Sequence, residues 1–192
     1  TGTQTVANVP VYTGWDEESI KDIFANEYLL NFILTNSRAF GEEKTVQVHQ
    51  EIALNLKKSA AVTEKKYLLI SRADSTLRGH YPTETEVLRR ELEKDNTICF
   101  DGEVICPYFA EGGRYTIDNV HYVRYGSELI PAAETEFAKD ETFGYHESDL
   151  KKYIHEKTEG RFKEDVVVDI SLEELSDIRI NEIVSKLKAV EH

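Results

Sequence analysis

Short apolar runs alternate with helix-like segments along most of the chain. Runs typical of buried strands occur at Val9–Tyr12, Leu29–Leu34, Tyr67–Ile70, Val104–Tyr108 and Val166–Ile170. Apolar residues recur at helical spacing in the segments Glu42–Val62, Thr83–Lys94, Ser148–Glu156 and Ile180–Val190. Strands that alternate with helices predict an α/β fold with a mostly parallel sheet flanked by helices. Thr83 and Glu86 have the spacing of a capping box at the start of their helix.

One segment breaks the alternation. Arg114–Tyr125 has two β-rich halves around Asp118 and Asn119, a turn signal that predicts an antiparallel hairpin inserted into the α/β fold. The segment that follows, from Pro131 to Asp149, is polar, lacks a clear period and is longer than a routine connection. Such a loop is typical of a functional or partner-covering segment, and plain surface coil is the alternative.

Length, charge and cysteine content restrict the classes of function that fit this chain. The 192 residues suit one domain, and 40% of them are hydrophobic, although no apolar run approaches the roughly 20 residues that a membrane span needs. A formal net charge of −13 argues against nucleic acid as a partner. Cys99 and Cys106 lie on or beside apolar segments and match no zinc spacing, so we expect buried reduced thiols and a cytoplasmic location.

The loop Ser71–His80, reading SRADSTLRGH, carries the strongest chemical signal. It follows a predicted strand, and in open α/β sheets ligands bind at the carboxyl ends of strands. Arg72 and Arg78 can each grip a carboxylate or a phosphate through a planar fork of donors. Asp74 can accept from hydroxyls or take a proton, and Ser75 adds a further hydroxyl. The alternative is a solvated turn whose charges pair with one another.

Three other loops are polar at comparable places. They are TGTQT, where Thr1, Gly2, Thr3 and Gln4 could form an anion-binding nest; TNSRA, with Asn36, Ser37 and Arg38; and EGGR, with Glu111, Gly112, Gly113 and Arg114. Each alone could be an ordinary turn. Together they predict an anion pocket lined by Arg38, Arg72, Arg78 and Arg114, with Asn36, Ser37, Asp74, Ser75 and Glu111 as hydrogen-bonding partners. His80 and His121 lack a second ligand at metal spacing, so we predict no metal site.

Five segments of this chain resemble, in the same order, the amino-terminal domain of the four-carbon acid sugar kinases. They read TGTQTVANVPVYTGWD, TNSRA, SRADSTLRGHYPTETE, ICPYFAEGGRYTIDNVHYV and PAAETEFAKDETFGY, and the resemblance runs from Thr1 to His192. Members of that family are two-domain enzymes that use ATP to phosphorylate threonate, erythronate or their 3-oxo forms on the terminal hydroxyl. The amino-terminal domain holds the sugar acid, and a carboxyl-terminal domain supplies most of the site for ATP with Mg²⁺.

The resemblance implies that the arginines hold the acid and that Asp74 orients or deprotonates the hydroxyl. In the family an acidic DDDP-like stretch precedes TGTQT, and its carboxylates are equal contenders for that role. The chain contains no methionine and starts abruptly. We therefore interpret residues 1–192 as a truncated substrate-binding domain that lacks its first strand and the nucleotide domain, and we expect it to be inactive alone.

Two other functions stay open at this point. The sequence contains neither GxxxxGK[ST] nor GxGxxG, so a non-catalytic module that binds a small acid is the alternative to a kinase domain. A third interpretation is an interaction domain whose loop from Pro131 to Asp149 mediates assembly. Such an assembly could be a homo-oligomer.

Overall fold

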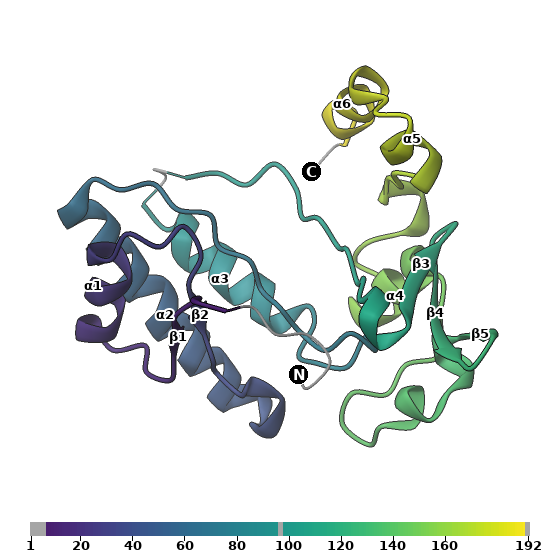
Figure 1. Cartoon of the computed structure of the whole chain (residues 1–192), viewed down its shortest axis with the longest axis horizontal. Helices are drawn as coiled ribbons and strands as arrows, with labels where there is room; N and C mark the ends of the chain where they lie inside the picture. The colour runs from purple at the N-terminus through teal and green to yellow at the C-terminus, as the bar shows by residue number, and fades with distance from the viewer. Residues whose placement is uncertain (1–6, 96–97, 191–192) are drawn as a thin grey trace. The chain divides into compact units, whose positions relative to one another are not determined.

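The computed structural model describes residues 7–95 and 98–190, and Figure 1 shows their elements. The chain divides into two compact units, the first comprising Thr1–Arg72 and Gly79–Phe100 and the second comprising Ala73–Arg78 and Asp101–His192. Helices, a parallel pair of strands and an antiparallel sheet occur together, which confirms the predicted α/β class. Within the described ranges, no helix has the length and apolar character to cross a membrane.

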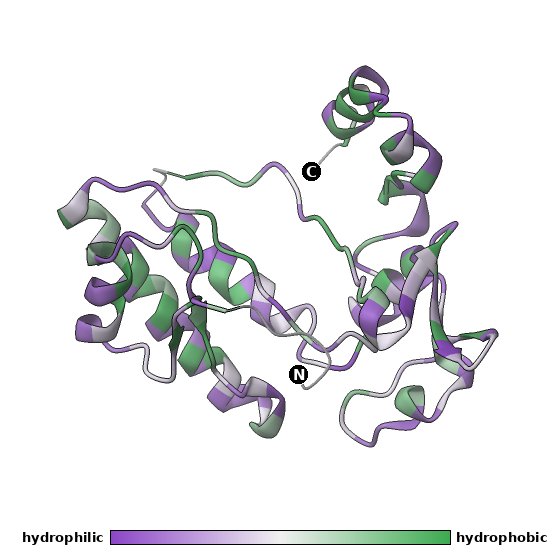
Figure 2. Ribbon diagram, in the orientation of Figure 1, coloured by the Kyte–Doolittle hydropathy of each residue, from purple (hydrophilic) through white to green (hydrophobic). Residues whose placement is uncertain are grey.

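The first unit packs three helices and a short parallel pair of strands. The strands are β1 (Val11–Tyr12) and β2 (Phe32–Ile33), and the helices are α1 (Glu17–Ala25), α2 (Glu42–Thr63) and α3 (Thr83–Glu93). Helix α1 begins where the Asp16 carboxylate accepts hydrogen bonds from two backbone N–H groups of its first turn. The buried core comprises Ile20, Phe24, Val48, Ile52 and Leu56. Figure 2 shows the apolar residues of α1, α2 and α3 in green.

The second unit contains the predicted hairpin. Strands β3 (Arg114–Ile117) and β4 (Val120–Tyr125) pair in antiparallel register, and β5 (Glu128–Pro131) extends the sheet to three strands. Asp118 and Asn119 have φ values of 47° and 68°, and positive φ at both turn positions matches the twist of a two-residue hairpin. The helices are α4 (Leu150–Lys157), α5 (Leu172–Ser176) and α6 (Ile180–Lys188). The short 3₁₀ turns of this unit are η2 (Ala110–Gly112), η3 (Ala132–Glu134), η4 (Glu136–Lys139) and η5 (Glu164–Val166), and the first unit contains η1 (Ser37–Ala39).

Three predicted strands do not form. The runs at Tyr67–Ile70, Val104–Tyr108 and Val166–Ile170 contain no strand. Tyr67 and Leu69 pack against the core, whereas Leu68 and Ile70 are 84% and 71% exposed, so the alternation expected of a strand is present. A strand also needs a neighbour to pair its backbone groups, and the parallel sheet described here contains β1 and β2 alone. The pattern therefore predicted the faces of the first run correctly and its pairing wrongly.

Two smaller predictions are also wrong. Thr83 is already the first helical residue, the N-cap is Pro82, and the Thr83 hydroxyl donates to Glu42 Oε1 at 2.8 Å, so the expected capping box is absent at this described helix start. Cys99 and Cys106 are free, as expected, but both are exposed because their segments form no buried strand. Because both thiols are exposed, the argument from buried cysteines to a cytoplasmic location no longer applies.

Candidate functional site

In the second unit, the segment from Asp74 to Arg78 folds into a closed turn. Leu77 N donates to Asp74 O at 3.2 Å, and Asp74 N donates to Arg78 O at 3.3 Å. Leu77 adopts a φ of 63°, a left-handed conformation that lets the chain reverse. Across the turn, Arg78 Nε donates to Asp74 Oδ2 at 2.9 Å, and the Thr76 hydroxyl donates to the same oxygen. The turn therefore presents a guanidinium and a carboxylate as one ordered pair.

Three buried side chains hold the backbone of this turn. They are His121 on β4, Tyr145 in the loop before α4 and Tyr153 on α4. Their polar atoms donate to the carbonyl oxygens of Ser75, Thr76 and Leu77 at 2.9, 2.9 and 3.0 Å respectively. Burial raises the pKa of Tyr145, so its hydroxyl keeps its proton and stays a donor.

The surroundings of His121 favour its neutral form in the folded protein. Burial lowers its pKa from the usual 6.5, the charge of Arg114 lowers it further, and the hydrogen bond to Ser75 opposes both effects. Because a carbonyl oxygen can only accept, Nε2 carries a proton, and Nδ1 lies 2.9 Å from the Thr116 hydroxyl oxygen. His121 thus connects the turn to strand β3, which begins at Arg114.

The EGGR loop in the second unit requires both of its glycines. A Cβ at Gly112 would come within 2.3 Å of the Phe109 ring, and Gly113 has a φ of 74°. This tight turn returns the chain so that Phe109 and Arg114 exchange backbone hydrogen bonds of 2.9 and 3.1 Å. Arg114 also donates to Gly112 O, whereas Glu111 is exposed. Gly112 thus permits the close approach of the Phe109 ring, and Gly113 supplies the positive φ of the turn.

Arg78 and Arg114 converge on one aromatic ring. Their Cζ atoms lie 4.9 and 5.4 Å from the centre of the Phe137 ring, within the range of a cation–π interaction. Phe137 belongs to η4, inside the long polar loop from Pro131 to Asp149. From the same loop, Asp140 Oδ2 lies 3.7 Å from Arg78 Nη1. The loop therefore covers two of the predicted arginines of the second unit.

Glu136 adds a carboxylate beside these arginines. The Tyr125 hydroxyl donates to Glu136 Oε2 at 2.7 Å, and this hydrogen bond lowers the pKa of Glu136. The charges of Arg114 and Arg78 lower the same pKa further. The second unit thus gathers two guanidinium groups and several oxygen acceptors, which is the chemistry that binds a hydroxyl-rich acid.

The remaining predicted residues lie in the first unit. Asn36 has a left-handed φ of 54°, and the Ser37 hydroxyl donates to the buried Glu84 Oε1 at 2.6 Å. His80 Nε2 donates to Phe40 O at 2.9 Å. This hydrogen bond links the end of the SRADSTLRGH loop to the residue that follows the TNSRA loop. Arg38 and Arg72 are exposed.

The structure therefore brings part of the predicted set together. Asp74, Ser75, Arg78, Glu111, Gly112, Gly113 and Arg114 belong to the second unit, and Asn36, Ser37, Arg38 and Arg72 belong to the first. The sequence predicted a single pocket lined by residues of both sets, and that pocket stays a prediction. The proposed anion nest of Thr1, Gly2, Thr3 and Gln4 lies outside the described residues.

Sequence reasoning missed several residues that shape this site. The long polar loop was singled out, but nothing in its composition marked Phe137, Glu136 or Asp140 as contacts of the arginines. Tyr145, Tyr153 and His121 look like ordinary core residues, because their hydrogen bonds span up to 76 positions in the chain. The one sequence signal that could have indicated some of these residues is the long aperiodic loop from Pro131 to Asp149, which contains Glu136, Phe137 and Asp140.

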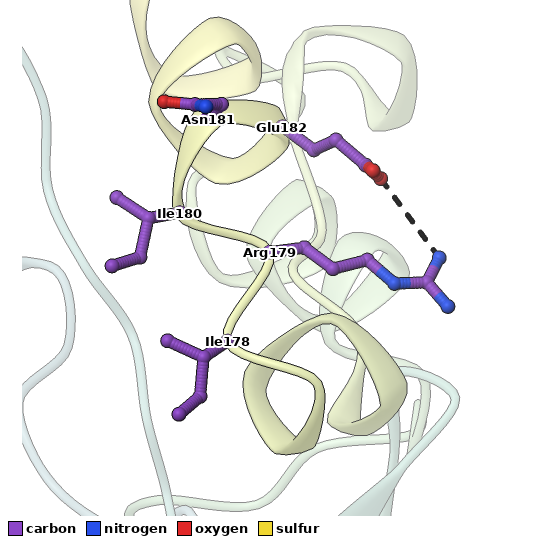
Figure 3. Close-up of a pocket in the computed structure, with 5 residues that line it drawn as sticks. All are labelled: Ile178, Arg179, Ile180, Asn181 and Glu182. Carbon is purple, nitrogen blue, oxygen red and sulfur yellow. Dashed lines mark ion pairs between the residues drawn. The ribbon is translucent and has the colours of Figure 1, made fainter.

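A depression between α5 and α6 is a separate surface feature. It is lined by Ile178, Arg179, Ile180, Asn181 and Glu182, and Figure 3 shows the two isoleucines pointing away from Arg179 and Glu182. Arg179 pairs with Glu173 and Asp177 at 2.5 and 2.7 Å, so its charge is already satisfied by neighbours. We therefore do not place ligand chemistry there. Over the described part of the chain, no group of three or more His, Cys, Asp or Glu side chains could hold a metal ion.

Comparison with known proteins identifies the family. A family described as the sugar-binding N-terminal domain matches residues 1–190. The crystal structure of Haemophilus influenzae protein HI1011, of the family DUF1537, matches with a TM-score of 0.52 and 15% sequence identity. The match covers 94% of this chain and 45% of that protein, so the chain spans less than half the length of this structural neighbour. No curated protein matches the chain. The chain belongs to the family of sugar-binding N-terminal domains.

Proposed function

We propose that this chain binds a four-carbon sugar acid of the threonate, erythronate or 3-oxo-tetronate type. The observation that carries the proposal is the convergence of Arg78 and Arg114 on Phe137 in a protein with a net charge of −13. An acidic protein repels a small anion unless local cations are held in place, and here the ring and the turn hold them. The sugar-binding description of the family agrees with a hydroxyl-rich ligand.

The ordered pair of Arg78 and Asp74 suggests how such an acid is held. Arg78 uses Nε to hold Asp74, and its Nη1 lies 3.7 Å from Asp140, a separation longer than a hydrogen bond. In the proposal, the ligand carboxylate takes the Nη edge of Arg78, with Arg114 nearby. The Asp74 carboxylate then accepts a hydrogen bond from a ligand hydroxyl and orients it. Ser75, Glu111, Asn36, Ser37, Arg38 and Arg72 stay in the proposal as further ligand contacts.

We further propose that the acid is the phosphoryl acceptor of an ATP-dependent kinase. The chain then serves as the amino-terminal substrate domain, and a carboxyl-terminal domain supplies most of the site for ATP and Mg²⁺. The chain matches only 45% of the Haemophilus influenzae protein, which leaves room for such a second domain in a relative. Asp74 is the candidate for orienting or deprotonating the attacking hydroxyl, because phosphoryl transfer depends mainly on positioning and electrostatics.

Calorimetric titration of threonate and of erythronate into the 192-residue protein tests the binding proposal. We expect one saturable site for at least one of these acids, and weaker binding after Arg78→Ala or Arg114→Ala. Threitol, which has the hydroxyls but lacks the carboxylate, is the matched control ligand and should not bind at the same concentrations. Equal binding of threitol would show that the arginines do not recognise the carboxylate.

A second measurement separates a kinase domain from a simple binding module. The chain alone should bind the acid without releasing ADP from ATP, because phosphoryl transfer needs both substrates in one closed site. A protein that joins this chain to a nucleotide-binding domain should release ADP when the acid is added. Acid-dependent ADP release by the chain alone would overturn the two-domain proposal. A joined protein that binds the acid but releases no ADP would favour the non-catalytic alternative.

A further inference from the structure

Three consecutive carbonyl groups of one turn each accept a hydrogen bond from a different buried side chain. The acceptors are Ser75, Thr76 and Leu77, and none of these residues belongs to a helix or strand. The donors His121, Tyr145 and Tyr153 are at most 3% exposed. They come from three places in the second unit that lie more than 40 residues away in sequence. Ordinary core packing does not require three polar atoms to meet one short turn.

The geometry of the turn explains what these bonds fix. Leu77 holds a left-handed φ that a residue with a Cβ adopts rarely, so the turn needs outside contacts to persist. Asp74 and Arg78 are its two ends, and their side chains are 2.9 Å apart. The orientation of each carbonyl determines where the next peptide points. The three donors therefore constrain the backbone of the turn from which the Arg78 guanidinium reaches Phe137.

We propose that His121, Tyr145 and Tyr153 are positioning residues of the acid-binding site, acting on the ligand through Arg78 and Asp74. This inference rests on the proposed function, since it assigns residues to the site that the proposal describes. None of the three touches the ligand. Their effect is to hold the turn in its ligand-binding conformation before the acid arrives, so that less ordering opposes binding.

Replacing tyrosine by phenylalanine separates positioning from packing. The Tyr145 and Tyr153 rings meet edge to face, with centroids 5.7 Å apart, and phenylalanine retains this contact. Tyr145→Phe removes the donor to Thr76 O, and Tyr153→Phe removes the donor to Leu77 O. Thr158→Val is the matched control, because the buried Thr158 hydroxyl donates at 2.7 Å to Ile154 O of α4 instead of to a carbonyl of the turn.

The test is calorimetric titration of threonate and erythronate into these variants, with thermal unfolding measured in parallel. All three variants should lower the unfolding midpoint by similar amounts. Only Tyr145→Phe and Tyr153→Phe should weaken acid binding, by about 2- to 10-fold, the scale of one hydrogen bond. Equal affinities for Tyr145→Phe, Thr158→Val and the unaltered chain would overturn the inference.

A pair of His121 variants provides a rescue experiment. Glutamine can place an amide N–H near the position of Nε2, so His121→Gln can keep the donor to Ser75 O, whereas His121→Leu cannot. Acid affinity should be closer to that of the unaltered chain in His121→Gln than in His121→Leu. The same loss in both variants would mean that His121 contributes only to folding.

A double variant tests whether the turn affects acid binding through Arg78. Tyr145→Phe should cause a smaller loss of affinity in the Arg78→Ala background than in the unaltered chain, because the guanidinium is gone and only Asp74 is left for the turn to position. Additive losses would overturn the assigned route. If Arg78→Ala itself leaves binding unchanged, the proposed function fails. If Arg78→Ala weakens binding and the tyrosine variants do not, only the positioning inference fails.

Discussion

The predicted arginines of the two units have different surroundings. Arg38 and Arg72 in the first unit are exposed, whereas Arg78 and Arg114 in the second are half-buried and share the Phe137 ring. All four arginines lie in or follow polar loops, so the sequence predicts each of them equally as an anion-binding residue. Only Arg78 belongs to a turn that buried donors hold. An arginine that the surrounding structure already orders loses less side-chain freedom when it binds a ligand, so we expect Arg78 to contribute more than an exposed loop arginine.

Removing the ordered guanidinium should have the largest effect. Arg78→Ala should weaken threonate or erythronate binding by about 1.5 to 3 kcal/mol, the scale of a hydrogen bond to a charged group. Arg89→Ala is the control, because Arg89 lies exposed on α3 and pairs with Glu93 at 3.3 Å on the same helix. Calorimetric titration measures both. Equal losses for the two variants would remove the distinction between an ordered arginine and a surface arginine.

The second prediction concerns pH and the buried His121. Its folded pKa lies below 6.5, so on acidification the unfolded chain takes up this proton first. The free energy of unfolding should therefore fall as the pH drops below about 6.5, until the folded pKa is reached. One proton limits the slope to about 1.4 kcal/mol per pH unit.

His121→Gln isolates this contribution. Denaturant unfolding between pH 5 and pH 8 should show a steeper acid loss in the unaltered chain than in the variant. Other groups, such as Glu136 with its lowered pKa, titrate in both proteins and cancel in the difference. Parallel curves for the two proteins would mean that His121 does not stay neutral in the folded state.

The third prediction concerns the ring that the two arginines share. Phe137→Leu keeps an apolar side chain but removes the ring face, which should weaken acid binding by about 0.5 to 2 kcal/mol. Tyr115→Leu is the matched control, because the Tyr115 ring lies 5.8 Å from the Cζ of Arg124, a residue outside the proposed ligand set. A larger loss in Tyr115→Leu would move the site away from Phe137.

The sequence predicted best what depends on local pattern. Helix α2 runs from Glu42 to Thr63 against an expected Glu42–Val62, and the hairpin turn falls at Asp118 and Asn119. Both follow from side-chain period and from the backbone preferences of turn residues. The loops that carry Arg78 and Arg114 were identified for the same reason, because polar residues and glycines mark turns locally.

What the sequence could not predict depends on pairing between distant segments. The run Tyr67–Ile70 alternates like a strand, but strand pairing requires a neighbour that the alternation does not specify. Phe137 is 59 positions from Arg78, and no local pattern connects them. The buried donors to the turn were missed likewise, since a tyrosine hydroxyl that bonds a distant carbonyl looks like any core tyrosine in sequence.

The smallest effect is expected for the exposed arginines of the first unit. Arg38→Ala and Arg72→Ala should each weaken acid binding by less than about 1 kcal/mol, because an exposed guanidinium must lose side-chain freedom to bind and its charge is screened by water. Raising the salt concentration should reduce these small losses further, whereas the loss in Arg78→Ala should persist. Titration at two ionic strengths measures both. If Arg72→Ala weakens acid binding as much as Arg78→Ala does at high salt, the ordering of an arginine in the unliganded protein does not decide how much it contributes to binding.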